Sequence, residues 1–147
     1  MTSSTTRSDI ELAARLRPAV IRTARRLRQE AGTDLSPSLA TALATIERHG
    51  PLTPSELAHR ERVQRPTITR VLARLEDAGL VDRAGDPADR RSCLLSISSD
   101  GSALLDAVRT RKDAFLAQRL DALDADDRAT LDRAAAILER MLQEGGE

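Results

Sequence analysis

Apolar residues recur at helical spacing along most of the 147-residue chain, which predicts a mainly α-helical protein. The first helix is expected from Asp9 to about Gly32, and its apolar stripe consists of Leu16, Val20, Ala24 and Leu27. Pro18 lies inside this segment, so the helix is expected either to kink there or to begin as a separate piece. Residues 1–8 are rich in Ser and Thr and have no apolar period, so they are expected to form a disordered arm.

Further helices are expected where polar cap residues precede an apolar stripe. Ser36 followed by proline provides an N-cap and a suitable first helical residue, and the stripe behind it is Leu39, Leu43 and Ile46. Two more helices are expected near the C-terminus, at about 99–123 and 124–143, each preceded by Ser or Asp residues.

The middle of the chain predicts two short helices joined by a polar turn. Thr53 and Glu56 have the spacing of a capping box, so the first of these helices should begin immediately after Thr53. The polar turn is expected at 59–64, and the second helix should open near Pro66 and end at Gly79. Its inward face is Ile68, Val71, Leu72 and Leu75.

Two β-rich runs follow this second helix. They cover 80–83 and 92–97 and are separated by a charged, turn-rich loop at 85–91, which predicts a β-hairpin. Helix, turn, helix, strand, loop and strand is the order of a winged helix-turn-helix. The predicted fold class is therefore mainly α with a small β-hairpin wing, accompanied by helices on either side.

The outward face of the second helix has the chemistry of a DNA-reading surface. Arginine can bind guanine with two hydrogen bonds, glutamine can bind adenine, and a threonine methyl can touch the methyl group of thymine. The candidate contacts on this helix and at its entrance are Gln64, Arg65, Pro66, Thr67, Thr69, Arg70 and Arg74. The candidate contacts on the wing are Asp89, Arg90 and Arg91, with the carboxylate of Asp89 orienting one guanidinium group.

An isolated helix of this kind is more often an ordinary solvated surface helix with surface arginines. The hairpin directly behind it favours the DNA-binding interpretation. A second hypothesis is a winged helix that docks or dimerises with proteins and no longer reads an operator.

The segment from Leu52 to Gly101 resembles the core of the MarR (multiple-antibiotic-resistance regulator) family of bacterial transcription factors. The resemblance rests on three motifs, PTITR in the predicted reading helix, LEDAGLVDR behind it, and DPADRR followed by LLSIS in the wing. The sequence departs from the family pattern at Gln64, where Ser or Thr is common and caps the helix better, and at Ile97-Ser98, which replaces Leu-Thr.

The resemblance implies a homodimer whose terminal helices intertwine, which would also cover the apolar stripes that a small winged domain leaves open. It implies a regulator, most often a repressor, on a pseudo-palindromic double-stranded DNA operator with half-sites roughly 34 Å apart. Residues 36–98 would then form the DNA-binding domain, and 9–34 with 99–147 the helical dimerisation region. A small, often anionic aromatic effector between these two parts, or cysteine oxidation, would relieve repression.

Charge is balanced overall but not locally. Lys plus Arg and Asp plus Glu number 23 each. Five arginines against one acid lie between His59 and Arg74, whereas eleven acids face seven bases from Asp100 onward. The reading helix is therefore expected to attract a phosphate backbone that the C-terminal part repels.

Other chemistry finds little support in the sequence. Cys93 alone forms no internal disulfide and is expected to be an ordinary strand residue rather than a redox sensor. His49 is expected to interact with a helix C-terminus and His59 to lie in the polar turn, where it touches phosphate or solvent. No metal-ligand spacing, cofactor motif or catalytic arrangement is visible, so an enzyme is not expected. With no signal peptide or apolar membrane span in the sequence, the expected location is the cytoplasm.

Overall fold

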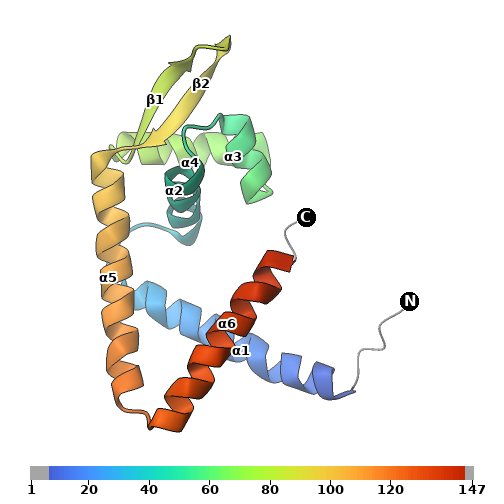
Figure 1. Cartoon of the computed structure of the whole chain (residues 1–147). Helices are drawn as coiled ribbons and strands as arrows, with labels where there is room; N and C mark the ends of the chain where they lie inside the picture. Colours follow the sequence, from blue (N-terminus) through green and yellow to red (C-terminus); the bar gives the residue numbers. More distant parts are fainter. Residues whose placement is uncertain (1–6, 145–147) are drawn as a thin grey trace.

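The computed structural model describes residues 7–144 and contains six helices and one two-stranded sheet within that range (Figure 1). The winged part and the helical arms occupy opposite ends of the molecule, and the long helix α5 runs between them (Figure 1). The elements, in chain order, are α1 (Arg7–Glu30), α2 (Pro37–His49), α3 (Pro54–Glu61), α4 (Arg65–Asp77), β1 (Val81–Asp86), β2 (Asp89–Ile97), α5 (Ser99–Asp121) and α6 (Ala125–Glu144). This confirms the predicted mainly helical fold with a hairpin wing.

Local capping signals set the starts of α2 and α3. The Ser36 hydroxyl accepts a hydrogen bond from the Leu39 amide at the start of α2. At α3, the Thr53 hydroxyl accepts from the Glu56 amide while the Glu56 carboxylate accepts from the Thr53 amide, so both bonds of the predicted capping box form. These two bonds lower the pKa of Glu56 below its ordinary value.

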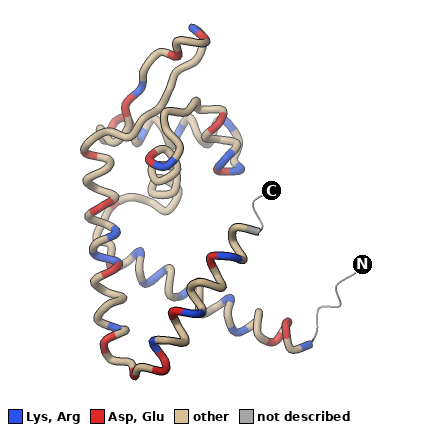
Figure 2. Tube along the Cα trace, in the orientation of Figure 1, with Lys and Arg blue, Asp and Glu red and all other residues tan. Residues whose placement is uncertain are grey.

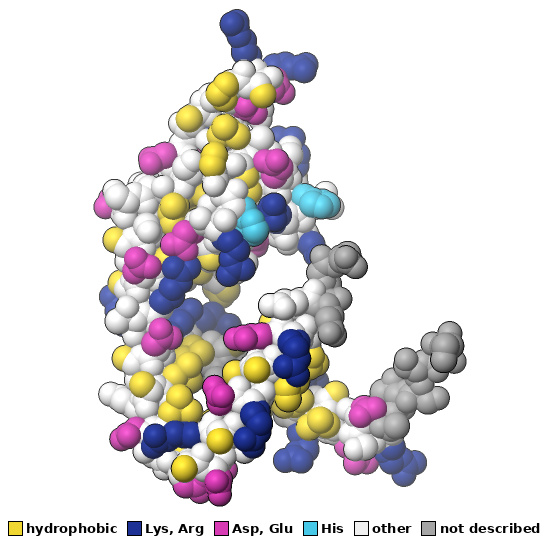
Figure 3. Space-filling model, in the orientation of Figure 1, with side chains coloured by type: hydrophobic (Ala, Val, Ile, Leu, Met, Phe, Trp, Pro, Cys, Tyr) yellow, Lys and Arg dark blue, Asp and Glu magenta, His cyan; other side chains and the backbone are white. Residues whose placement is uncertain are grey.

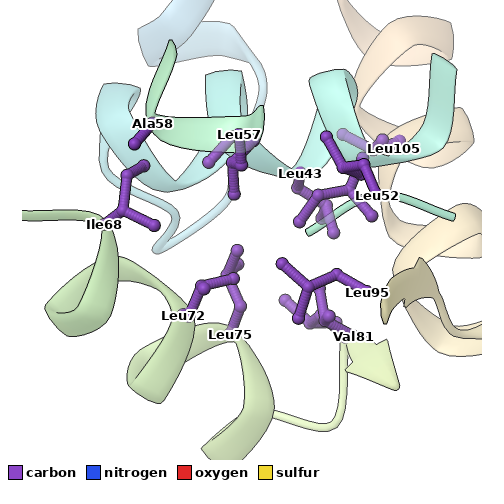
Figure 4. Close-up of a cluster of buried hydrophobic side chains, with 13 residues drawn as sticks. Leu43, Leu52, Leu57, Ala58, Ile68, Leu72, Leu75, Val81, Leu95 and Leu105 are labelled. Carbon is purple, nitrogen blue, oxygen red and sulfur yellow. The ribbon is translucent and has the colours of Figure 1, made fainter. Parts of the chain in front are cut away.

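The inward faces of α2, α3 and α4 meet the base of the hairpin in one apolar core. Figure 4 shows these side chains converging from the helices and both strands. Leu43, Leu57, Leu75 and Leu95 are fully buried there, and Leu105 extends the cluster onto α5. Because apolar burial is the dominant stabilising contribution, this core fixes α4 and the root of the wing relative to each other.

The hairpin is longer than the sequence indicates. β1 and β2 pair antiparallel from Val81 opposite Ile97 to Gly85 opposite Cys93, with a bulge between Gly85 and Asp86. Leu52 adds an isolated bridge to Leu95 on the other edge of β2. The prediction of a loop at 85–91 was therefore wrong, since most of these residues continue the strands and only 87–88 lie between them. Backbone pairing extends the ladder through residues whose charged side chains face solvent.

Two further expectations, for residues 7–8 and for His59, are corrected at the level of single residues, and for Pro18 the alternative of a separate first helical piece is excluded. Arg7 and Ser8 belong to α1, while residues 1–6 of the expected arm lie outside the described part of the chain. Pro18 lies within one helical segment, at the cost of the hydrogen bond that its missing N–H would have donated. His59 lies inside α3, because that helix continues to Glu61 and the turn occupies only 62–64. His49 ends α2, as predicted.

Candidate nucleic-acid interface

Helix α4 presents an exposed face opposite its single buried stripe. Ile68, Leu72 and Leu75 point into the core, and every residue predicted to contact DNA on this helix is exposed. Gln64 is the N-cap but makes no side-chain capping bond, as its departure from the usual Ser or Thr predicts. The Thr69 hydroxyl donates to the Arg65 carbonyl at 3.0 Å, so its methyl group is the part best placed for an external contact.

A cleft of about 570 Å³ runs along one flank of α4. Thr67, Arg70 and Arg74 of α4 line it together with Ser36 and Ser38 from the start of α2. Sequence reasoning did not place these two serines at the site, because only the fold brings the start of α2 beside α4. Two arginines and two serines that line one cleft form a basic, hydrogen-bonding surface of the kind that positions phosphates.

The wing tip supplies a second basic feature away from α4. Arg90 and Arg91 lie at the start of β2, and dark-blue side chains project from this tip in Figure 3. The Asp89 carboxylate accepts a hydrogen bond from the Arg91 amide at 2.9 Å and lies 3.6 Å from the Arg91 Nε atom. The side chain of Arg91 is nevertheless 94% exposed, so this ion pair leaves it available to a ligand.

Basic positions lie at the wing tip, around α3 and α4, and along α1, while acidic positions gather where α5 turns into α6 (Figure 2). The structure brings the α4 residues together on one surface and places the wing arginines on a separate projection. A helix flanked by a basic projection matches the size and charge of a DNA groove beside its phosphate backbone.

Comparisons with known proteins agree with this geometry. The sequence profile of the MarR family matches residues 35–93. An uncharacterized HTH-type transcriptional regulator of Mycobacterium leprae is 41% identical over 93% of this chain and 96% of its own length. The multiple antibiotic resistance protein MarR of Salmonella typhimurium is 33% identical over 67% of this chain and 69% of its own length. The chain belongs to the MarR family. A crystal structure of a Pseudomonas aeruginosa protein shares its fold with a TM-score of 0.84 and 38% identity, covering 94% of this chain and 99% of the other.

In this MarR-family chain the root of the wing is tied to α4 by polar contacts. Arg83 of β1 donates from Nε to a Glu76 carboxylate oxygen at 2.6 Å and from Nη1 to the Cys93 sulfur at 2.9 Å. The Glu76 hydrogen bond is the main cause of a raised pKa at Arg83. Cys93, expected to be an ordinary strand residue, is half-buried and contacts a cation that the sequence analysis did not pair with it.

A second cleft, of about 440 Å³, separates the winged part of this MarR-family chain from α1 and α5. Its apolar lining includes Leu27, Leu105 and Val108, and its cations are Arg28, Arg109 and Lys112. Arg109 bridges to the Glu47 carboxylate of α2, which raises the pKa of Arg109. Arg28 and Lys112 form no ion pair within residues 7–144, and Lys112 is half-buried.

Within the described residues, no helix has the length and apolar character needed to cross a membrane. The same residues contain no group of three or more His, Cys, Asp and Glu side chains that could hold a metal ion.

Proposed function

We propose that this MarR-family regulator is a homodimer that binds a pseudo-palindromic DNA operator and represses transcription. The reading surface is α4, with Gln64, Arg65 and Pro66 at its entrance and Arg70 at its centre. The wing arginines contact the phosphate backbone or the minor groove beside it, and Asp89 orients Arg91. The observation that carries the proposal is the exposed Thr and Arg face of α4 on a helix whose opposite face is buried in the apolar core.

The homodimer is supported by α1 and α6, which contain no buried residue among those whose side chains are described. Large apolar side chains are exposed on both helices, including Ile10, Leu12, Ile21, Ile137 and Met141. The two helices also differ in charge, since α1 has seven arginines against three acids and α6 has five acids against three arginines. A second copy that brings α6 against α1 would cover apolar surface and pair opposite charges.

The reading surface is tested with Arg70→Ala, because Arg70 points away from the core and lines the α4 cleft. A DNA duplex selected by the wild-type protein from a random library is titrated by fluorescence anisotropy at fixed salt. Arg70→Ala should weaken specific binding by about 1–3 kcal/mol and relax the preference at one base pair. Arg91→Ala should reduce the salt dependence of binding by about one unit of slope if it neutralises one phosphate.

Arg140→Ala is the matched control, since it removes an exposed arginine from α6, a helix that adds no residue to the core of the winged part. Its affinity should equal that of the wild type. Wild-type affinity in both Arg70→Ala and Arg91→Ala would show that the site is assigned wrongly. A purified protein with no salt-dependent DNA binding at all would favour the alternative, a protein-docking module.

We also propose that a small aromatic anion relieves repression by binding in the cleft between α1, α2 and α5. The apolar lining would hold a ring, while Lys112 and Arg28, which have no ion pair within residues 7–144, would attract a carboxylate.

Benzoate and its ring-substituted derivatives should release wild-type protein from DNA. The Lys112→Ala variant should require roughly tenfold more ligand for the same release, as expected for a lost charged hydrogen bond. Benzyl alcohol is the uncharged control; equal release by the acid and the alcohol, or unchanged release in Lys112→Ala, would contradict this proposal.

A further inference from the structure

Arg83 connects three elements at the root of the wing. Its side chain leaves β1, contacts Glu76 in the last turns of α4, and contacts Cys93 on β2. We call Glu76, Arg83 and Cys93 the wing-root cluster. Each of the two contacts joins residues on different elements, so the cluster links the reading helix to both strands of the hairpin.

The base of the hairpin is held by Val81 and Leu95 in the apolar core, but its outer half has few supports. At its base, Leu95 pairs with Leu52, and Ser98 bonds to the Gly79 and Leu80 carbonyl groups. Beyond Arg83, the residues of β1 are exposed or only partly buried, and none belongs to the apolar core. A two-stranded hairpin is marginally stable by itself, so the direction of its outer half depends on side-chain contacts near its root.

We propose that the wing-root cluster positions the wing relative to α4, with Arg83 as a positioning residue for DNA binding. The inference rests on the proposed function, because it assumes that both α4 and the wing contact the same duplex. A wing held at one angle presents Arg90 and Arg91 to the backbone while α4 occupies the groove. A mobile wing would bind DNA more weakly, because ordering the wing on the duplex costs conformational entropy.

The small contribution of this ion pair to folding stability predicts which measurement should change when the cluster is broken. Glu76 and Arg83 are 31% and 45% exposed, and exposed pairs of this kind contribute little to folding stability. Substitutions in the cluster should therefore leave thermal unfolding nearly unchanged. Their effect should appear in DNA affinity and should depend on the wing arginines.

The decisive variant is Glu76→Gln, because simple electrostatics and positioning predict opposite results. Removing an acid near DNA should strengthen binding if charge alone matters. Losing the partner of Arg83 should weaken binding if the cluster positions the wing. Asp77→Asn is the matched control, since Asp77 is the neighbouring exposed acid of α4 and has no ion pair or side-chain hydrogen bond within residues 7–144.

Binding is measured by anisotropy with the selected duplex, in the full-length wild type and in a background with Arg90→Ala and Arg91→Ala. Glu76→Gln and Arg83→Ala should each weaken binding roughly threefold to tenfold in the wild type, the range expected when coupled residues are separated. Both losses should disappear in the background without wing arginines, whereas Asp77→Asn should bind as tightly as wild type or more tightly. Arg83→Lys should recover part of the affinity, because it keeps the ion pair with Glu76.

Several results would overturn the proposal. Unchanged or tighter binding by Glu76→Gln would do so, and so would a loss of equal size with and without the wing arginines, which would instead indicate direct contact or a general folding effect. Wild-type affinity after Arg90→Ala and Arg91→Ala would overturn it as well, because the wing would then have nothing to position. Absence of DNA binding by the wild type would reject the proposed function and the positioning role together. This result is distinguishable from the others because it is seen in the unsubstituted protein.

Discussion

Gly101 has no side chain, and this allows the start of α5 to pack closely against the winged part. It is buried in the first turn of α5, where a Cβ atom would lie 2.8 Å from the Ile97 side chain and closer still to the Leu80 carbonyl oxygen. That carbonyl also accepts a hydrogen bond from the Ser98 amide. The start of α5 therefore cannot move away from this contact without disturbing the root of the wing.

Gly101→Ala should consequently destabilise the protein. Forcing a methyl group against backbone and a core side chain typically costs about 1–3 kcal/mol. Urea unfolding followed by circular dichroism should show this loss, and Gly85→Ala is the control because its Cβ would meet nothing within 4 Å. Equal unfolding midpoints for the wild type and Gly101→Ala would mean that the Leu80 backbone shifts freely.

At the same scale, the sequence predicts contacts between near neighbours much better than contacts between distant residues. The Thr53 and Glu56 capping box was predicted because all its atoms lie within one helical turn. The position of Ser38 beside Arg70 was not predicted, since it depends on how α2 packs against α4. Arg62 was also missed: it ends α3 in a left-handed conformation, with φ of 53°, that glycine normally favours, and a polar arginine gives no local sign of it.

At the scale of elements, apolar periodicity predicts the helices closely and the hairpin only in outline. The buried stripe of α4 was predicted because Ile68, Leu72 and Leu75 repeat at helical spacing. The outer half of the wing has no such signal, since residues 89–91 are charged and exposed, and their strand conformation depends on backbone pairing across the hairpin. For this reason Arg90 and Arg91 were predicted to lie in a loop although they belong to a strand, and their geometry relative to Arg83 required the structure.

The whole molecule is asymmetric in how well its two ends are packed. The winged part buries its apolar residues within one chain, whereas the apolar stripes of α1 and α6 remain open, including a cleft lined by Leu12, Leu16, Ile137 and Met141. Phe115, the one aromatic residue of the chain, has the guanidinium groups of Arg26 and Arg119 at 5.5 Å and 4.9 Å from its ring centroid, so it contributes to the contact between α1 and α5. A helical end built in this way is suited to hold two winged parts at a fixed separation.

This arrangement predicts that one charge on the apolar stripe of α6 separates the subunits. Ile137→Asp places a carboxylate where a second copy would bury an isoleucine that is 47% exposed in the single chain. Sedimentation equilibrium should then give the 16.0 kDa mass of one chain, against twice that mass for the wild type. Operator affinity should fall by roughly 100-fold or more, because two half-sites would no longer be bound by one linked pair of reading helices. Ala136→Asp introduces the same charge on the polar face of α6 between Asp132 and Arg140, and should leave both the mass and the affinity unchanged. A wild type that sediments as a single chain, or an Ile137→Asp variant that keeps the mass and affinity of the wild type, would show that this surface does not hold the dimer together.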